Sequence, residues 1–380
     1  MRIRLTHAAA PRAAAVLPLP RPLRPLAPLA AALALLAAAT GCGLAGNDGG
    51  SVSRGSLDGR LTGAGATFPE PLFAEWMTYY GEHVETGAGI DYQAVGSGGG
   101  IEQFLAGTVD FGSSERYLEE SELEVAADVR GCPAVQFPVI FGAVVIAMND
   151  EALDGLILTP EVIAGIYDRS ITRYDDPAIA ELNPDLALPG EEIVPVHRSD
   201  GSGTTFVFTH YLTTEVPSWA ENYSAGTDIA WHEDTRGGDG NEGVTRTVRD
   251  NPGGLGYVNQ SYALSNNLAT ARVVNADDTP VAPTLAATTA ASEEAEIPDD
   301  FQFAIDGIGG DGYPITGANW IFAYECGYDE DTAALLRDFW TWTLSDATAD
   351  QSAAALGYAP MGRALKTRVI EEITRINASG

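Results

Sequence analysis

Arg198 lies in a short segment whose residue types are suited to binding an anion. The segment runs from residue 197 to 205 and reads His-Arg-Ser-Asp-Gly-Ser-Gly-Thr-Thr, and three apolar residues, Phe-Val-Phe, follow it. Arginine supplies a planar fork of donors, and glycines let the backbone approach a ligand closely. The apolar run predicts the start of a helix, whose free N–H groups carry partial positive charge. The segment therefore predicts an anion cradle.

Two other glycine-rich segments have a similar form. Residues 62–69 read TGAGATFP, which predicts a helix with Thr67 as a hydroxyl cap and Pro69 near its first position. Residues 96–100 read GSGGG and precede Ile101 and Phe104 at helical spacing. One such turn is an ordinary connection, and Thr67 and Ser97 could serve only as helix caps. Three such turns in one chain favour a shared site.

The chain of 380 residues carries a net charge of −32. Residues 1–41 contain five arginines and no acidic residue, so the remaining chain is still more acidic. Such a surface repels nucleic acids and anionic membranes, which excludes a nucleic-acid-binding function. An anion would have to be held by short-range, preorganised donors, because long-range electrostatics oppose its approach.

The N-terminus has the pattern of an export signal. Basic residues precede an apolar run over residues 29–39, which is short for a membrane span. The run ends in Ala-Thr-Gly-Cys, and small residues before a cysteine resemble a bacterial lipoprotein cleavage site. We therefore expect residues 1–41 to be a signal peptide, Cys42 to carry a lipid on the outer face of the cell membrane, and residues 42–58 to form a flexible tether.

Two further cysteines, Cys132 and Cys326, remain in the chain. In an oxidising compartment such a pair is expected to form one disulfide. The alternative is two unpaired, buried thiols.

Strand-like and helix-like segments alternate along the chain, which favours the α/β class. Residues 276–300, rich in Ala, Thr, Pro and acidic residues, predict a mobile surface segment. The clearest strands are expected at residues 135–147, 193–196, 255–258 and 320–324, and the clearest helices at 161–167 and 333–344. In open α/β sheets, ligands bind beyond the carboxyl ends of the strands, where the three glycine-rich turns are expected to lie.

Enzyme interpretations find less support. Ser202 lies five residues after His197 but without a Gly-x-Ser-x-Gly elbow. The glycine-rich turns lack the Gly-Lys-Ser/Thr ending of a nucleotide P-loop, and the five histidines have no metal-ligand spacing. We therefore expect neither catalysis nor a cofactor or metal.

The ordered set of motifs resembles the family of substrate-binding proteins of the high-affinity phosphate ABC transporter. The motifs are residues 61–69, 96–99, 109–114 and 198–204, and the match extends over nearly the whole mature chain. The resemblance implies a two-lobed, type II periplasmic-binding (Venus-flytrap) fold with hinge crossovers. Lobe 1 would comprise residues 59–141 and 315–380, and lobe 2 residues 142–314. Phosphate would bind in the cleft, and the lobes would close over it.

The resemblance also implies a set of ligand residues. Asp200 would orient the binding arginine, and Phe68 and Gly203 would act through their backbone N–H groups. The phosphate-binding residues carried over by position are Thr67, Phe68, Ser97, Glu115, Arg198, Ser202, Gly203 and Thr204. The implied function is extracytoplasmic binding of inorganic phosphate by a monomer that delivers it to the permease subunits.

Glu115 departs from the family pattern, which usually has aspartate at this position to accept a hydrogen bond from the proton of phosphate. Sulfate carries no proton at neutral pH, so one of its oxygens would face the carboxylate oxygen with no hydrogen between them. Such a mismatch costs on the order of 1–3 kcal/mol. Glutamate keeps the carboxylate but is one methylene longer. A receptor for another tetrahedral oxyanion, such as sulfate or arsenate, remains an alternative, as do an exported phosphatase and a surface protein that senses phosphate.

Overall fold

The computed structural model describes residue 55 and residues 57–378. Residues 57–378 belong to one compact unit. The predicted signal peptide, Cys42 and most of the predicted tether lie outside the described residues. In the described part of the chain, no helix is long and apolar enough to span a bilayer.

Nine strands of the described chain form one mixed sheet, with the order β2-β1-β3-β12-β4-β8-β6-β7 and with β9 paired to β4. A smaller sheet has the order β11-β10-β5. The strands are β1 (Asp58–Gly65), β2 (Gly87–Ala94), β3 (Phe111–Ser114), β4 (Ala134–Met148), β5 (Ile157–Leu158), β6 (Val194–Arg198), β7 (Arg236–Gly238), β8 (Gly254–Asn259), β9 (Ala269–Thr270), β10 (Arg272–Val274), β11 (Pro280–Val281) and β12 (Thr316–Tyr324).

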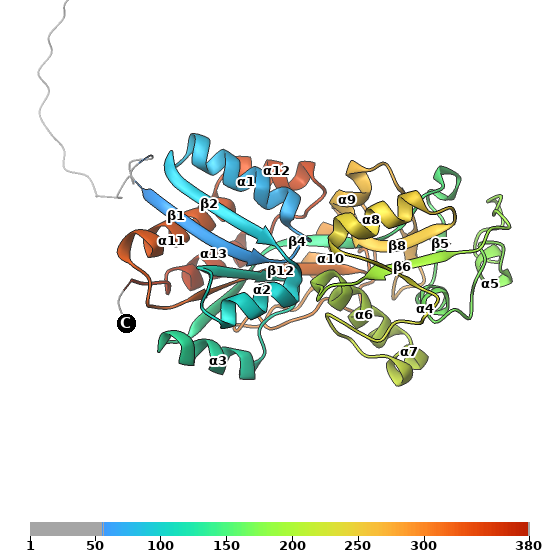
Figure 1. The fold of residues 1–380 in the computed structure, drawn as a ribbon. Coiled ribbons are helices and arrows are strands. Elements are labelled where there is room, and N and C mark those ends of the chain that lie inside the picture. Colours follow the sequence, from blue (N-terminus) through green and yellow to red (C-terminus); the bar gives the residue numbers. More distant parts are fainter. Residues whose placement is uncertain (1–54, 56, 379–380) are drawn as a thin grey trace, which may run out of the picture. The chain divides into compact units, whose positions relative to one another are not determined.

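The long strand β4 belongs to both halves of the large sheet. Its first part pairs with β12 up to Ala143, and from Val144 onward it pairs with β8. We call the half with β1, β2, β3 and β12 lobe 1, and the half with β6, β7 and β8 lobe 2. Figure 1 shows that the blue N-terminal and red C-terminal elements gather in lobe 1, whereas the green and yellow middle of the chain forms lobe 2.

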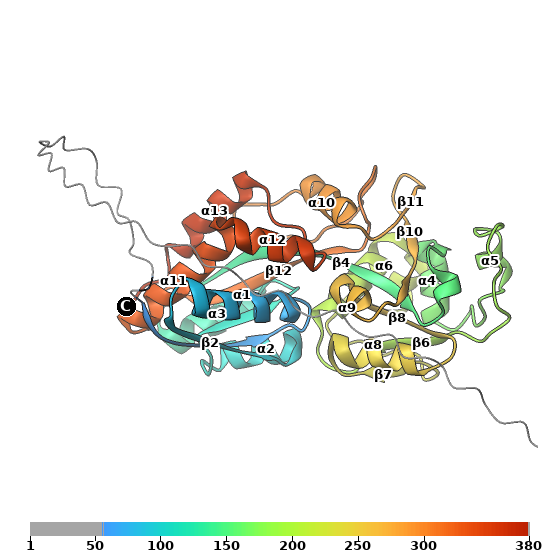
Figure 2. The same cartoon turned by 90° about the horizontal axis from the view of Figure 1, so that it is seen from above.

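Helices cover the sheet in both lobes, and Figure 2 shows the same two groups from above. Lobe 1 carries α1 (Glu70–His83), α2 (Gly96–Leu105), α3 (Glu120–Arg130), α11 (Glu330–Ser345), α12 (Ala347–Ala355) and α13 (Arg363–Ile373). Lobe 2 carries η1 (Glu151–Leu153), α4 (Pro160–Tyr167), α5 (Pro177–Ala180), α6 (Gly203–Glu215), α7 (Pro217–Asn222), α8 (Gly240–Asp250) and α9 (Gln260–Ser265), and α10 (Leu285–Glu294) precedes the return to lobe 1.

The predicted strands and helices named above are confirmed at β4, β6, β8, β12, α4 and α11. Apolar faces explain why they form here. In α1, for example, Leu72, Phe73, Trp76 and Tyr80 recur at helical spacing and are almost fully buried. Phe73 lies against Trp340 of α11, with ring centroids 5.5 Å apart. Aromatic packing of this kind ties the N-terminal and C-terminal segments into one lobe.

Residues 276–300, interpreted as a mobile surface segment, lie largely at the surface but contain regular structure. The segment contains β11 and the helix α10, whose Ala287, Thr288 and Ala291 are buried. Thr284 caps this helix by accepting a hydrogen bond from the Ala287 amide at 3.1 Å. Its alanines and threonines are small enough to pack closely, so one face of the helix lies in close contact with the protein.

Two predicted helix starts also differ from the structure. Thr67 does not cap α1, because the helix begins at Glu70 and its cap residue is Pro69, which makes no side-chain hydrogen bond. Residues 96–100 are not a turn before a helix but the first turns of α2 itself. Close backbone contacts explain these glycines: a Cβ on Gly100 would lie 2.3 Å from the Cα of Gly65.

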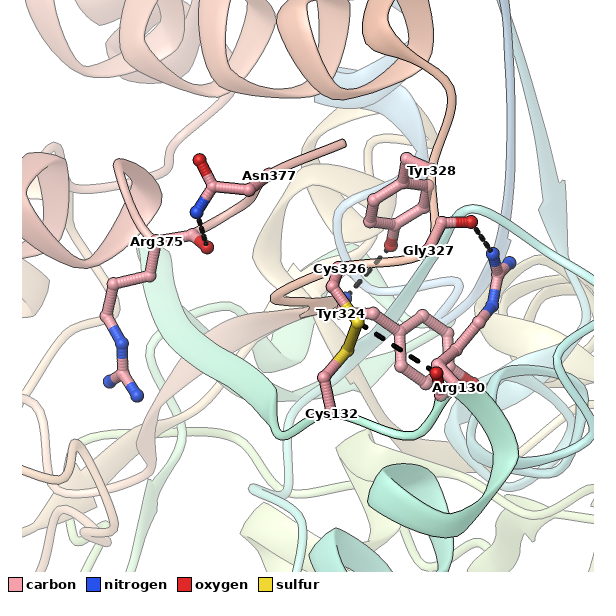
Figure 3. Close-up of a disulfide and its surroundings, with 8 residues drawn as sticks. All are labelled: Arg130, Cys132, Tyr324, Cys326, Gly327, Tyr328, Arg375 and Asn377. Carbon is pink, nitrogen blue, oxygen red and sulfur yellow. Dashed lines mark hydrogen bonds between the residues drawn. A yellow bond between two sulfur atoms is a disulfide. The ribbon is translucent and has the colours of Figure 1, made fainter. Parts of the chain in front are cut away.

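The predicted disulfide between Cys132 and Cys326 is confirmed, and it joins segments 194 residues apart in the sequence (Figure 3). It connects the chain after α3 to the chain after β12. Beside it, the Arg130 guanidinium donates to the carbonyl of Gly327 at 2.7 Å and lies 4.8 Å from the ring centroid of Tyr324. These contacts fasten the C-terminal strand to the N-terminal part of lobe 1.

Candidate functional site

The predicted ligand residues follow the carboxyl ends of parallel strands. Thr67 follows β1, Ser97 follows β2 and Glu115 follows β3, and these three strands run parallel in lobe 1. In lobe 2, Arg198 ends β6, which runs parallel to β7 and β8. The predicted location of the turns at strand ends is therefore correct, and both lobes contribute such ends to one region.

Arg198 is almost completely buried, and Asp200 fixes its orientation. Nε of Arg198 donates to Oδ1 of Asp200 at 2.7 Å, and Nη2 donates to Oδ2 at 2.5 Å. Burial opposes ionisation of Asp200, but the bonds from Arg198 outweigh it and lower the pKa of the carboxyl group. Asp200 also accepts from the Gly240 amide at 3.0 Å. A bidentate pair of this kind holds the guanidinium as a fixed donor, with Nη1 directed toward Thr204 at 3.3 Å.

The start of α6 supplies free amides beside this arginine. Ser202 caps the helix: its Oγ accepts from the Thr205 amide at 3.0 Å, and its own amide donates to Thr227. The next two amides, of Gly203 and Thr204, have no acceptor among the described residues, as is expected for the first turn of a helix. Two free amides at this place are what the anion cradle predicted from this segment would require.

Thr67 of lobe 1 is joined to lobe 2 through Asn241, the second residue of α8. Nδ2 of Asn241 donates to Oγ1 of Thr67 at 2.9 Å and to Oγ1 of Thr204 at 3.2 Å. Its Oδ1 accepts from the Asn259 amide at 2.9 Å, which fixes the orientation of the side chain. The Asn241 side chain is fully buried. It therefore joins two predicted ligand hydroxyls from different lobes.

Ser97, Glu115 and Gly203 meet where the lobes come together. A Cβ on Gly203 would lie 2.4 Å from Oε2 of Glu115 and 2.5 Å from Oγ of Ser97, so this approach requires glycine. Nearby, the Gly98 amide donates to the carbonyl of Gly201 across the lobes at 2.9 Å. The turns predicted to share a site thus lie against one another.

Glu115 is buried and has polar partners on both carboxyl oxygens. Oε1 accepts from Nδ2 of Asn319 at 2.7 Å, and Oε2 accepts from Oγ of Ser97 at 3.2 Å. Burial raises the pKa of Glu115 to about 7, against the opposing effects of Asn319, Arg198 and Ser97. This acid consequently exchanges a proton near neutral pH, where phosphate also does.

Phe68 lies between β1 and α1 with its ring fully buried. Its carbonyl accepts from the hydroxyl of Tyr358 at 2.6 Å, and its amide has no acceptor in the described part of the chain. A cavity of about 370 Å³ opens beside these residues and is lined by Thr67, Asp200 and Gly240 together with the acidic residues Glu70, Asp239 and Glu242. Of the predicted phosphate-binding residues, Thr67 alone lines this cavity, and its charged neighbours there are acidic.

Asn241 and Asn319 are the two site residues that the sequence reasoning missed. Asn241 had a recognisable signal: Gly237-Gly238-Asp239-Gly240 precedes it and repeats the pattern of a glycine-rich turn before a helix. Asn319 had none, because it lies in an apolar run that reads as an ordinary buried strand.

His197 and Ser202, the candidates for a catalytic base and nucleophile, both make contacts that hold the fold together. His197 directs Nδ1 to the carbonyl of Arg198 at 2.8 Å and stacks on Trp231, whereas Ser202 caps α6. Burial lowers the pKa of His197. Among residues 57–378, no cluster of three or more His, Cys, Asp or Glu side chains could hold a metal ion. The arrangement is suited to holding a tetrahedral oxyanion by fixed donors.

Comparison with known proteins places this chain in a family. Residues 50–347 match the PBP superfamily domain. The phosphate-binding protein PstS of Xylella fastidiosa is 37% identical over 307 residues, which cover 80% of this chain and 81% of that protein. The PstS of Haemophilus influenzae is 35% identical, covering 79% of this chain and 88% of the relative.

The fold is also shared with solved structures at lower sequence identity. A high-affinity periplasmic phosphate-binding protein, PfluDING, solved with bound phosphate, is 23% identical with a TM-score of 0.68 and covers 82% of this chain and 92% of that one. An ancestral soluble variant of the human phosphate-binding protein also has a TM-score of 0.68, at 20% identity and covering 85% of this chain and 99% of that one. These likenesses confirm the predicted two-lobed α/β fold of the periplasmic-binding class. With the sequence relatives, they establish that the chain belongs to the PBP superfamily and, within it, to the PstS family of phosphate-binding proteins.

Proposed function

We propose that this protein binds inorganic phosphate between its two lobes and delivers it to the permease subunits of an ABC transporter. The observation that carries the proposal is the convergence of Arg198, the free amides of α6 and the hydroxyls of Thr67 and Ser97 on one buried region. Both lobes supply donors, so a bound oxyanion would favour the closed arrangement. The relatives named as phosphate-binding proteins support phosphate as the ligand.

The proposed ligand set is the one expected from the sequence, extended by one residue. Thr67, the Phe68 amide, Ser97 and Glu115 come from lobe 1, and Arg198, Ser202, Gly203 and Thr204 come from lobe 2. Asp200 orients the arginine, and Asn241 joins the two hydroxyl groups across the cleft. The proposed lobe boundaries, after residues 141 and 314, lie close to the point where β4 changes partners from β12 to β8.

Glu115 favours phosphate over sulfate in this proposal. Its ionised carboxylate accepts a hydrogen bond from the proton of a phosphate dianion, whereas sulfate offers only acceptors. The fixed amides, the hydroxyls and Arg198 supply the remaining bonds to either anion. An arsenate anion carries a proton as phosphate does, so this carboxylate does not distinguish the two.

The protein acts by binding alone in this proposal, as a monomer without cofactor or metal. Export by the signal peptide of residues 1–41 and lipid attachment at Cys42 would hold it at the outer face of the membrane. Residues 42–58 would then form a tether long enough for the lobes to reach the permease.

Calorimetric titration of the mature protein tests the ligand. We expect phosphate to bind and to raise the melting temperature, and equal concentrations of sulfate at pH 8 to do neither. Arg198→Ala should weaken phosphate binding by more than 100-fold. A guanidinium that donates two hydrogen bonds to phosphate contributes more than a single charge-assisted bond, which is worth roughly 1.5–3 kcal/mol. Equal affinities for both anions would contradict phosphate selectivity, and turnover of a phosphate ester would indicate a phosphatase.

A further inference from the structure

The two carboxyl oxygens of Glu115 have different surroundings. Oε1 faces an amide donor, Nδ2 of Asn319, at 2.7 Å. Oε2 faces the hydroxyl of Ser97 at 3.2 Å and the position where a side chain on Gly203 would begin. Since Gly203 is the first residue of the anion cradle on α6, Oε2 is the oxygen on the side of the ligand.

Asn319 is itself held in place. Ser113 exchanges hydrogen bonds with its side chain, with Oγ at 2.9 Å from Nδ2 and at 3.1 Å from Oδ1. Both residues are fully buried. The pairing of β12 with β4 shifts register between Asn319 and Trp320, and an irregularity of this kind redirects a side chain from a strand. The strand thus aims the amide at Glu115.

An amide N–H that points at Oε1 favours a proton on the other oxygen, because the carbonyl oxygen of a carboxylic acid is a better acceptor than its hydroxyl oxygen. A proton on Glu115 therefore belongs on Oε2, where the Ser97 hydroxyl can rotate from donor to acceptor. We propose that Asn319 is a positioning residue that confines proton exchange by Glu115 to the oxygen facing the anion, and thereby sets the preference for protonated over unprotonated oxyanions. This inference rests on the proposed function.

The confined proton has a chemical consequence. When Glu115 is ionised, Oε2 accepts the proton of a phosphate dianion in a hydrogen bond. When Glu115 is protonated, Oε2 instead donates to a bare oxygen, so sulfate becomes an acceptable ligand. Selectivity against sulfate should then be lost as the pH falls through about 7, the pKa to which burial raises Glu115.

Other groups near Glu115 bear on this pH dependence. Arg198 favours the ionised form, and Tyr92 and Tyr358 interact with the carboxylate but have pKa values raised far above neutral by burial. His210 lines a cavity of about 20 Å³ together with Glu115 and contacts Asp306 at 3.2 Å. A His210→Gln variant therefore checks that the pH effect arises at Glu115.

Asn319→Asp tests the role of the amide with almost no change of shape. The new carboxylate would face Oε1, and two buried carboxyl groups in contact share one proton. Glu115 Oε2 then remains an acceptor across the pH range. Asn183→Asp is the matched control: Asn183 is also buried, but its side chain bonds to backbone groups at Ile157 and Ile179.

The measurement is the sulfate inhibition constant in competition with labelled phosphate, at pH 6 and pH 8 and at constant ionic strength. Sulfate does not titrate in this range, so the change reports the protein alone. For an acid with a pKa of about 7, the protonated fraction changes about 10-fold between these values. We expect that change in the wild type, in Asn183→Asp and in His210→Gln, and less than a 2-fold change in Asn319→Asp.

The outcomes distinguish failure of the proposed function from failure of the role of Asn319. A wild-type protein that fails to bind phosphate overturns the proposed function. Phosphate binding with a pH-independent sulfate constant, or an Asn319→Asp variant that behaves as the wild type, overturns only the role of Asn319. If Asn319→Asp does not fold, as judged by circular dichroism and thermal unfolding, Ser113→Ala replaces it. Loss of the Ser113 hydroxyl frees Asn319 and should reduce the pH effect, and an unchanged effect contradicts the inference.

Discussion

Gly203→Ala should block closure of the lobes without unfolding either one. The added Cβ would lie 2.4 Å from Oε2 of Glu115, 2.5 Å from Oγ of Ser97 and 2.7 Å from the backbone amide nitrogen of Glu115. A flexible carboxylate could move aside, but the backbone of Glu115 is fixed by β3 and cannot yield by the required distance. All of these neighbours belong to lobe 1, whereas Gly203 belongs to lobe 2.

The expected loss of affinity follows from the donors that would be separated. With the lobes apart, an anion on α6 keeps Arg198 but loses the bonds from Thr67, Ser97 and the Phe68 amide. Hydrogen bonds to a charged group contribute roughly 1.5–3 kcal/mol each, and the open state recovers part of this through water. A net loss of about 3–4 kcal/mol corresponds to a 10²- to 10³-fold weaker affinity for phosphate.

Calorimetric titration with phosphate measures this loss, and thermal unfolding without ligand measures folding. Gly362→Ala is the control: Gly362 precedes α13 with an ordinary φ of −62°, and a Cβ there would meet nothing within 4 Å among the described residues. We expect Gly362→Ala to bind as the wild type, and both variants to melt within a few degrees of it. Wild-type affinity in Gly203→Ala would show that the observed contact between lobes is not part of the binding state.

Three further predictions concern other parts of the structure. Asn241→Asp should weaken phosphate binding at least 10-fold by calorimetry, because it places a negative charge between Thr67 and Thr204. An unchanged affinity would show that Asn241 does not belong to the phosphate site. Replacing Cys132 and Cys326 by serine should lower the free energy of unfolding in urea by about 2–4 kcal/mol, since it frees a long loop; equal stability would contradict a structural role of the bridge. Burial raises the pKa of Glu115 from 4.5 to about 7, so the folded ligand-free protein binds more protons than the unfolded chain between these values. The free energy of unfolding of the wild type should therefore fall relative to that of Glu115→Gln, by on the order of 1–3 kcal/mol, as the pH rises from 4.5 to about 7. A difference in unfolding free energy between the two proteins, measured in urea, that stays the same at every pH would refute the raised pKa of Glu115.

The sequence was sufficient to predict the α/β class of fold, because alternating strand-like and helix-like segments are local patterns, whereas the ligand residues were carried over from a family resemblance and stay a prediction. Apolar periodicity predicted β4 and α11, and the segment from His197 to Thr205 predicted a helix start with free amides beside Arg198. The cysteine count and the expected compartment predicted the disulfide. These features follow from residue type and spacing, without knowledge of tertiary contacts.

The errors arose where tertiary contacts decide the outcome. Thr67 was expected to cap a helix, but its hydroxyl oxygen instead accepts a hydrogen bond from Asn241, 174 residues later. The composition of residues 276–300 gave no sign of a helix, yet part of the segment forms α10 and buries Ala287, Thr288 and Ala291. Asn319 could not be identified, because its partner Glu115 is 204 residues away and a strand with one buried amide has no distinctive pattern.

The most direct test of the account is the position of the bound oxyanion. Crystals grown with arsenate, which has the shape and charge of phosphate, allow arsenic to be located by its anomalous scattering. We predict one strong site, with oxygens within hydrogen-bond distance of the Arg198 guanidinium and the Gly203 amide on one side and of Thr67 and Ser97 on the other. Arsenic bound to one lobe alone, or at a place that Arg198 does not reach, would contradict the claim that both lobes bind one anion.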